Sequence, residues 1–249
     1  KRCTCNYPVG ELCHAARMSS YCVRRRRNRR SKRMFEPLLA PGCTLVILGS
    51  GTSLRFAPFD KPNYVFWGAA ELWGKVPRLD GAITIYSETK LRAEGLWEPL
   101  KRIPIPIYMQ RECPDIPTAR RYPLEDVVAA FTVGGRDKPF LTCTVSDLLA
   151  LALLQTVPIK AICLYGVDMV QGTEYAAQRP SCEFFLGVCH GRRIPVYVHP
   201  VSDLLKVQFL YGFEEAARTA QQRDLEEREL WFRVQHDQIV IELQTLLTK

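Results

Sequence analysis

The stretch LVILGSGTSL, residues 45–54, decides the fold class that the sequence predicts. Its apolar run Leu45–Leu48 has the length of a buried strand and meets the turn Gly49–Gly51, which Thr52 and Ser53 follow. Glycine permits a sharp turn and a close approach of backbone to ligand. A helix beginning after the turn would aim its free N–H groups at an anion such as a phosphate. The alternative is an ordinary strand-to-helix turn with a Ser or Thr cap.

The glycine turn completes neither of the two familiar phosphate-binding motifs. It lacks the third glycine of the dinucleotide-binding fingerprint and the lysine of a P-loop. Alone it is a weak signal for a nucleotide site, so the prediction depends on a second motif elsewhere in the chain.

Beyond this turn, apolar runs of strand length alternate with helical patterns. The predicted strands are Cys43–Leu48, Asn63–Trp67, Ala82–Tyr86, Ile105–Met109, Ala161–Tyr165 and Ile194–Val198, and the predicted helices are Glu88–Leu100, Leu124–Phe131, Ser146–Gln155 and Cys182–Cys189. Prolines within Ile105–Met109 favour an edge strand there. Continuous apolar strands alternating with helices indicate an α/β fold that is Rossmann-like, with a mostly parallel sheet and helices on both faces.

The positive charge of the chain is concentrated in its first 33 residues. Eleven of the 34 Lys and Arg residues lie there with one acid, whereas the remainder has 23 basic and 25 acidic residues. Residues 34–249, which include the Rossmann-like body at 34–212, are therefore not a general polyanion binder. Nucleic acid is expected only through residues 1–33, whose arginine run could grip phosphates.

Three interpretations of residues 1–33 stay open. The segment is sequence translated from upstream of Met34, a disordered basic tail, or a metal- or nucleic-acid-binding module. The module interpretation rests on candidate zinc ligands without the usual CxxC pairs: Cys3, Cys5, Cys13, His14 and Cys22. The six later cysteines are predicted to be buried, reduced thiols of the core: Cys43, Cys113, Cys143, Cys163, Cys182 and Cys189.

Residues 213–249 form a third segment, which is charged and has neither glycine nor proline from Glu214 to Leu247. Leu225, Phe232, Ile239 and Leu246 recur every seven residues, but only one of the three companion positions is apolar, so a continuous coiled coil is not expected. The segment predicts a long C-terminal helix that packs on the body, on a protein partner or on a second copy of the chain. No apolar run approaches the roughly 18 residues of a membrane span, and no signal peptide is visible. We therefore expect no membrane partner.

A second motif spans Thr142–Gln155 and the strand Ala161–Tyr165 that comes after it. Hydroxyl residues open an apolar helix, and the strand ends in Gly-Val-Asp168. Thr144 and Ser146 can cap the helix or contact a phosphate or a sugar. Asp168 lies just past a strand end, where a carboxylate can meet a ribose or a divalent metal ion. Its alternative role is to cap the turn that follows.

Together the two motifs resemble a known fold group. GSGTSL, residues 49–54, is similar to the opening of the MptE-like 6-hydroxymethylpterin diphosphokinases and of bacterial sialyltransferases that use CMP-sialic acid. Both groups also have a hydroxyl-started helix and then a strand ending in G-[VI]-D, as in Ser146 to Asp168. The resemblance implies a Rossmann-like domain that binds a nucleotide or nucleotide-activated substrate. If the protein is an enzyme, it implies a transferase of phosphoryl, pyrophosphoryl or glycosyl groups.

A further set of segments is similar to a group of bacteriophage-encoded proteins of this fold. These segments are Tyr165–Met169, Glu174–Tyr175, Gln178–Pro180, Ser202–Leu205 and Leu210–Gly212. The similarity implies a viral protein in the cytoplasm of an infected bacterial host or in the virion.

The chain departs from the sialyltransferase pattern at three positions that hold the nucleotide there. Ser50 replaces an Asn in the glycine turn, and the ends of the second and third strands read Trp67-Gly68 and Tyr86-Ser87 instead of Asn. Losing three amide contacts argues against the same ligand. It favours the alternative of a non-enzymatic phage structural or interaction protein that keeps the fold.

The predicted nucleotide site combines the glycine turn, a strand end and two helix starts. Its binding residues are Gly49, Ser50, Gly51, Thr52, Ser53, Ser87, Thr144, Ser146 and Arg179. Arg179 would offset phosphate charge or else form a surface pair with a glutamate. The catalytic candidates are Asp168 and His199, the latter as a general base or else as an exposed or capping residue before Pro200. The expected cofactor is a nucleotide with a divalent cation, and the sequence has neither a paired-carboxylate motif with metal spacing nor an HExxH motif.

Overall fold

The structure, a computed structural model, describes residues 39–170, 174–207, 210–214, 222–236 and 239. All the elements below belong to the compact unit Pro37–Lys249. Residues 1–33, with their predicted basic run and zinc ligands, lie outside the described residues.

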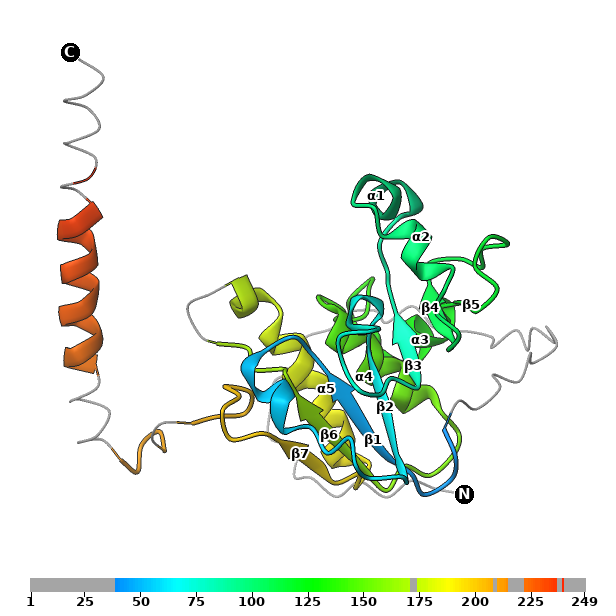
Figure 1. The fold of residues 1–249 in the computed structure, drawn as a ribbon. Helices are drawn as coiled ribbons and strands as arrows, with labels where there is room; N and C mark the ends of the chain where they lie inside the picture. The colour runs from blue at the N-terminus through cyan, green and yellow to red at the C-terminus, as the bar shows by residue number, and fades with distance from the viewer. Residues whose placement is uncertain (1–38, 171–173, 208–209, 215–221, 237–238, 240–249) are drawn as a thin grey trace, which may run out of the picture. The chain divides into compact units, whose positions relative to one another are not determined.

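Seven strands form one parallel sheet in the order β5-β4-β3-β2-β1-β6-β7 (Figure 1). The strands are β1 Thr44–Leu48, β2 Tyr64–Ala69, β3 Gly81–Ile83, β4 Ile107–Met109, β5 Ala119–Arg121, β6 Ala161–Tyr165 and β7 Val196–Val198. The α-helices are α1 Glu88–Ala93, α2 Trp97–Leu100, α3 Leu124–Phe131, α4 Thr144–Leu154 and α5 Arg179–Gly191, and the 3-10 helices are η1 Thr52–Phe56, η2 Ala70–Leu72 and η3 Glu174–Ala177. The predicted α/β, Rossmann-like fold is confirmed.

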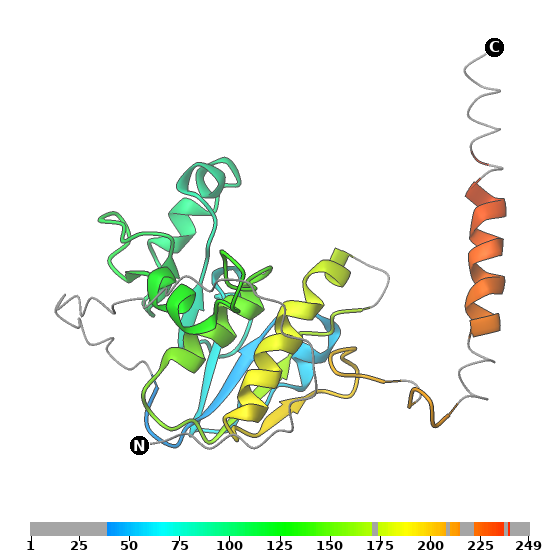
Figure 2. The same cartoon turned by 180° about the vertical axis from the view of Figure 1, so that it is seen from behind.

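Helices cover both faces of the sheet. Side chains alternate between the two faces along each strand, so apolar side chains project from both faces and need a covering layer on each. Figure 2 shows α3, α4 and α5 across one face, and α4 packs against α3, α5 and β2. On the other face, Val46 and Leu48 of β1 join a core cluster with Leu91 of α1 and Trp97 of α2. All five residues of β1 are buried, which fits its position inside the sheet with helices on both sides.

The chain reverses its direction of travel across the sheet at β1. From β1 it adds β2, β3, β4 and β5 on one side and then returns to place β6 on the other side of β1. The carboxyl ends of β1 and β6 therefore diverge into connections that leave in opposite directions. In open parallel sheets, ligands bind in the crevice at such a switch point.

Three predicted elements differ from the structure. The strand Ile105–Met109 was expected at the edge, but β4 lies between β3 and β5. The prolines at 104 and 106 precede the paired residues Ile107–Met109, so they remove no ladder donor from β4. The edge strand on this side of the sheet, β5, reads Ala-Arg-Arg and has no apolar run by which the sequence could reveal it.

The other two differences concern helices. The single helix predicted over Glu88–Leu100 is two short helices, because Gly95 adopts a φ of +70° that ends α1. The helix expected after the glycine turn is η1, a 3-10 helix of five residues. So short a helix has little dipole to offer an anion.

The C-terminal segment is helical over residues 222–236. Of the residues predicted to repeat every seven positions, Leu225, Phe232 and Ile239 are all more than half exposed, and Leu246 lies outside the described residues. The parts of the predicted helix at 215–221, 237–238 and 240–249 lie outside the described residues, and its role in binding a partner stays a prediction. Among the described helices, none combines the length and apolarity needed to cross a membrane.

Candidate functional site

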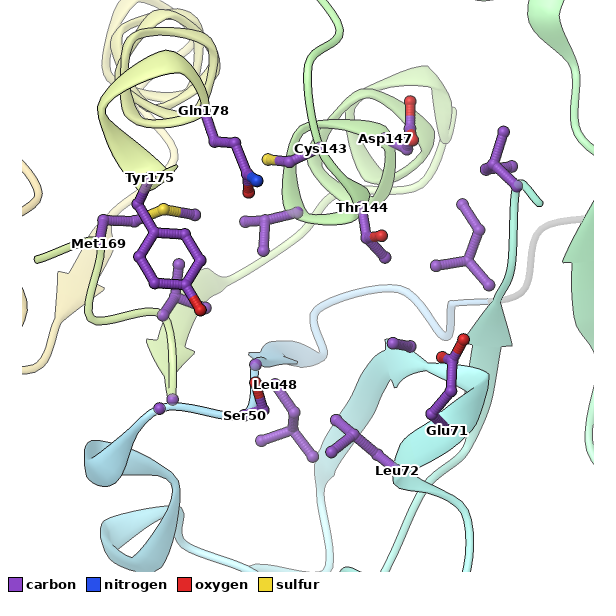
Figure 3. Close-up of a pocket in the computed structure, with 18 of the residues that line it drawn as sticks. Leu48, Ser50, Glu71, Leu72, Cys143, Thr144, Asp147, Met169, Tyr175 and Gln178 are labelled. Atoms are coloured by element: carbon purple, nitrogen blue, oxygen red, sulfur yellow. The ribbon is translucent and has the colours of Figure 1, made fainter. Parts of the chain in front are cut away.

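A cavity of about 1130 Å³ lies at the carboxyl edge of the sheet, over the switch point between β1 and β6. The turns after β1, β3 and β6 line it together with the first turn of α4. Figure 3 shows Leu48 and Ser50 on one side of this cavity and Cys143 and Thr144, at the start of α4, on the facing side. The ring of Tyr175 reaches into the space between them.

Two glycines allow the turn after β1 to touch the turn after β6. A Cβ on Gly49 would lie 2.2 Å from the carbonyl oxygen of Gly166, and a Cβ on Gly166 would lie 2.3 Å from the carbonyl oxygen of Gly49. Gly166 also has a φ of +70°, a conformation that favours glycine. The contact is closed by hydrogen bonds from Gly49 N to Tyr165 O, 2.8 Å, and from Gly51 N to Gly166 O, 2.7 Å.

The anion held by the glycine turn is the protein's own Asp168. Its carboxylate accepts hydrogen bonds from the Thr52 hydroxyl at 2.9 Å, from the Ser53 backbone N–H at 3.1 Å and from the Ser53 hydroxyl. Burial by itself would raise the pKa of Asp168, but the hydrogen bonds from Ser53 and Thr52 outweigh it and lower the pKa. The donors expected to bind a phosphate are therefore largely occupied within the fold, and Asp168 is held in place as their acceptor.

Ser53 completes this link between the two turns. Its side chain is fully buried, and its hydroxyl oxygen accepts a 2.7 Å hydrogen bond from the Gly166 N–H while the hydroxyl donates to Asp168. Gly51 is fitted to the same carboxylate, since a Cβ there would lie 2.5 Å from an Asp168 oxygen. Small residues at these positions let a charged side chain sit against backbone.

The first turn of α4 is capped by Cys143 and Ser146. The Ser146 hydroxyl oxygen accepts from the Cys143 N–H at 3.2 Å, and the Cys143 sulfur accepts from the Ser146 N–H, which together form a capping box. Ser146 also donates to the Cys143 carbonyl at 2.6 Å and is fully buried. Thr144, the first residue of the helix, points into the cavity instead (Figure 3).

Two titratable side chains of this turn have pKa values shifted into the neutral range. A hydrogen bond with Cys182, followed by hydrogen bonds at Ser146 and Val145, lowers the pKa of Cys143 to about 6 against the effect of burial. Burial, and then the charge of Cys143, raises the pKa of Asp147 to about 7. Both residues line the cavity, so acid–base chemistry near pH 7 is available there.

A buried hydroxyl in the cavity wall has no partner. Thr84, just beyond the end of β3, is 3% exposed, and its Oγ1 forms no hydrogen bond in the described part of the chain. An unpaired buried hydroxyl costs about 1–3 kcal/mol. Thr84 lines the cavity but its oxygen is covered, so a polar group of a bound molecule could pair with it only after the side chain moves.

The structure brings six of the predicted site residues to the cavity and leaves five outside its lining. Those that line it are Gly49, Ser50, Gly51, Thr52, Thr144 and Asp168. Those outside its lining are Ser53, Ser87, Ser146, Arg179 and His199.

Each of the outlying residues has another role in the fold. Ser53 and Ser146 are fully buried, as described above. Ser87 accepts from the Lys90 N–H as the cap of α1. Arg179 forms a 2.7 Å ion pair with Glu183, which agrees with the alternative of a structural Arg–Glu pair. His199 stacks on Phe56 with ring centroids 4.8 Å apart.

Sequence reasoning missed Thr84, Cys143 and Asp147 as cavity residues. Cys143 directly precedes the predicted hydroxyl-rich helix start, so its place at a helix cap was a usable signal. Thr84 gave no such signal, since one hydroxyl inside an apolar run has no distinctive spacing. The described residues contain no group of three His, Cys, Asp or Glu side chains able to hold a metal ion.

Comparisons of the chain with protein-family models, with curated proteins and with solved structures found no match.

The turn-to-turn contact predicts a large penalty for one added methyl group. Gly49→Ala should lower the free energy of unfolding by about 2–4 kcal/mol, because backbone meets backbone and neither side can move aside alone. Gly187→Ala in α5 is the control, since a Cβ there meets nothing within 4 Å and should change stability by at most ~1 kcal/mol. Urea unfolding of both variants measures the loss of unfolding free energy. Equal stabilities would show that the contact between Gly49 and Gly166 has room for a methyl group.

The raised pKa of Asp147 predicts a specific pH dependence. Its folded pKa of about 7 exceeds the ordinary value of 3.8, so the protonated carboxyl favours the folded state. The wild type should therefore lose stability relative to Asp147→Asn as pH rises from 4 to 8, by about 2–4 kcal/mol in total.

Urea unfolding at both pH values measures this difference, in which the contributions of other groups largely cancel. Asp137→Asn, in an exposed loop, is the control and should follow the wild type. A gap between wild type and Asp147→Asn that stays constant with pH would show that Asp147 is not desolvated.

Proposed function

We propose that the cavity over the switch point binds a nucleotide or a nucleotide-activated small molecule. The observation that carries the proposal is the position of the cavity at the carboxyl ends of β1 and β6, where parallel sheets of this order bind ligands. Its volume of about 1130 Å³ is ample for a nucleoside with an attached group. The Thr144 hydroxyl, which points into the cavity, adds a polar group suited to a sugar or a base.

The charged side chains that line the cavity restrict the class of ligand that it could bind. Among the described residues, one basic side chain, Lys75, lines it together with the carboxyl groups of Glu71, Asp147 and Asp168. The glycine turn already holds Asp168, and the Cys143 sulfur occupies an N–H group of α4. So few free cationic or N–H donors suit a nucleoside or a monophosphate better than a di- or triphosphate.

Group transfer is the activity proposed for such a site, on the strength of one observation. Asp147, with a pKa of about 7, lines the cavity and is matched to general acid–base work at neutral pH. In this proposal Asp168 organises the turn, and Asp147 would exchange the proton in a phosphoryl, pyrophosphoryl or glycosyl transfer. The proposal extends, through the sequence resemblance, to a bacteriophage protein acting in an infected host or in the virion.

Thermal unfolding of the full chain with nucleosides, nucleoside monophosphates and nucleoside diphosphates tests the binding proposal. A ligand at ten times its Kd stabilises by about 1.4 kcal/mol, which raises the Tm of a chain of this size by about 3–5 °C. Thr144→Trp fills the cavity from its α4 side and should abolish the shift. Thr156→Trp, an exposed threonine outside the lining, should keep it.

Three outcomes count against this function. No shift with any of these compounds at millimolar concentration contradicts nucleotide binding, and a shift with diphosphates alone contradicts the preferred class. A shift that persists in Thr144→Trp but disappears at high salt would assign the binding to charged residues outside the cavity.

A further inference from the structure

Two cysteine thiols meet behind the wall of the cavity. The loop before α4 crosses the first turns of α5, and the Cys143 and Cys182 sulfurs lie 3.5 Å apart. A second contact lies beside it, since the hydroxyls of Thr142 and Ser181 are 2.6 Å apart. Both thiols are free, and their separation is about 1.5 Å longer than a disulfide bond. A small side-chain movement would join them.

The two thiols have opposite properties. Cys143 lines the cavity and is half-buried, with its sulfur directed toward Gln178 (Figure 3). Cys182 lies behind it, fully buried in α5. The hydrogen bond to Cys143, and then burial, raises the pKa of Cys182, while the same contact lowers the pKa of Cys143. The contact therefore favours the negative charge on Cys143, which lines the cavity, and the proton on Cys182.

Of the six cysteines predicted to be buried, Cys43, Cys182 and Cys189 are buried, whereas Cys113, Cys143 and Cys163 are only partly buried. Three thiols outside the pair show that the lowered pKa of Cys143 depends on its contact with Cys182. Burial raises the pKa of Cys43 and of Cys163, and it raises the pKa of Cys189 to about 11. Cys189 is as deeply buried in α5 as Cys182. What distinguishes Cys143 is its place at the α4 cap, where N–H groups stabilise a sulfur anion, together with the Cys182 thiol as a hydrogen-bond donor.

The wall of the same cavity contains a second polar feature besides the Cys143 sulfur. The Thr84 hydroxyl in the same wall is buried without a partner, as described above. The cavity thus provides both a route to the Cys143 sulfur and an unpaired polar group on its wall.

We propose that Cys143 and Cys182 form a redox-active dithiol that reduces a hydroperoxide admitted through the cavity. The Cys143 thiolate attacks one peroxide oxygen and the O–O bond breaks. The departing oxygen takes a proton from solvent and leaves as an alcohol or as water, and Cys143 becomes a sulfenic acid. The Cys182 sulfur then attacks the Cys143 sulfur, an S–S bond forms, the S–O bond breaks, and hydroxide leaves with the Cys182 proton as water.

The electrons balance over the two steps. The two sulfurs lose two electrons, the peroxide gains them, and the products are a disulfide, one alcohol or water from the peroxide, and one further water. A low-molecular-weight thiol would return the pair to the reduced state by thiol–disulfide exchange. This chemistry is separate from nucleotide binding and does not depend on it.

Hydrogen peroxide added to the reduced full chain at pH 7, followed by peptide mass spectrometry, tests the proposal. The peptides of Cys143 and Cys182 should become cross-linked with the loss of two hydrogen atoms. Cys189→Ser is the matched control in the same helix and should cross-link like the wild type. Peptide mapping separates this bond from any that form at cysteines elsewhere in the chain.

Two variants of Cys182 separate its two roles. Cys182→Ser keeps a hydrogen-bond donor but cannot form the disulfide, so Cys143 should stop at a sulfenic acid that dimedone traps. Cys182→Ala removes the donor as well, so the pH midpoint for alkylation of Cys143 by iodoacetamide should rise from near 6 by a unit or more. Cys182→Ser should keep the midpoint close to that of the wild type.

The proposal is overturned by either of two results. One is a wild-type chain that remains folded with peroxide and forms no cross-link between these peptides. The other is an alkylation rate of Cys143 that still rises steeply above pH 8, as for an ordinary thiol. Loss of nucleotide-induced stabilisation in Thr144→Trp bears on the proposed ligand alone and leaves this test unaffected.

Discussion

The hydrogen bonds that the Asp168 carboxylate accepts from Thr52 and Ser53 are the interaction on which the rest of the site depends. They join the turn after β1 to the turn after β6, two segments more than a hundred residues apart in the chain. Hydrogen bonds to a charged acceptor contribute about 1.5–3 kcal/mol each. The pairing of β1 with β6 and the backbone hydrogen bonds of Gly49 and Gly51 bring the two turns together, and the Asp168 carboxylate fixes the start of η1 against the turn after β6.

The same interaction explains why this site differs from a common phosphate cradle. A glycine turn and a helix N-terminus are the usual anion-binding features of a parallel α/β fold. Here the first holds the Asp168 carboxylate and the second holds the Cys143 sulfur. The fold thus satisfies both features internally, and a ligand would be recognised more by the shape of the cavity and by hydroxyl groups such as that of Thr144.

One turn of α4 concentrates the chemistry that remains. Cys143 and Asp147 lie four residues apart. The pKa of Cys143 is lowered to about 6, and the pKa of Asp147 is raised to about 7. Burial disfavours the charge on both groups, but hydrogen bonds from N–H groups and from Cys182 compensate only the sulfur. The negative charge therefore rests more easily on Cys143, and that charge keeps the nearby carboxyl protonated to a higher pH.

The sequence by itself determined the α/β class, most of the strands and the position of the glycine turn at a strand end, because apolar runs and glycines act locally. It did not reveal β5, whose Ala-Arg-Arg strand is defined only by its partner β4. It grouped Ser146, Arg179 and His199 with the glycine turn, since spacing along the chain does not show which way a side chain points. Only the tertiary structure decided that Asp168 fills the turn after β1 and that Cys143 meets Cys182. Both are contacts between distant segments, and they follow from how the sheet and its helices pack rather than from any local pattern of residues.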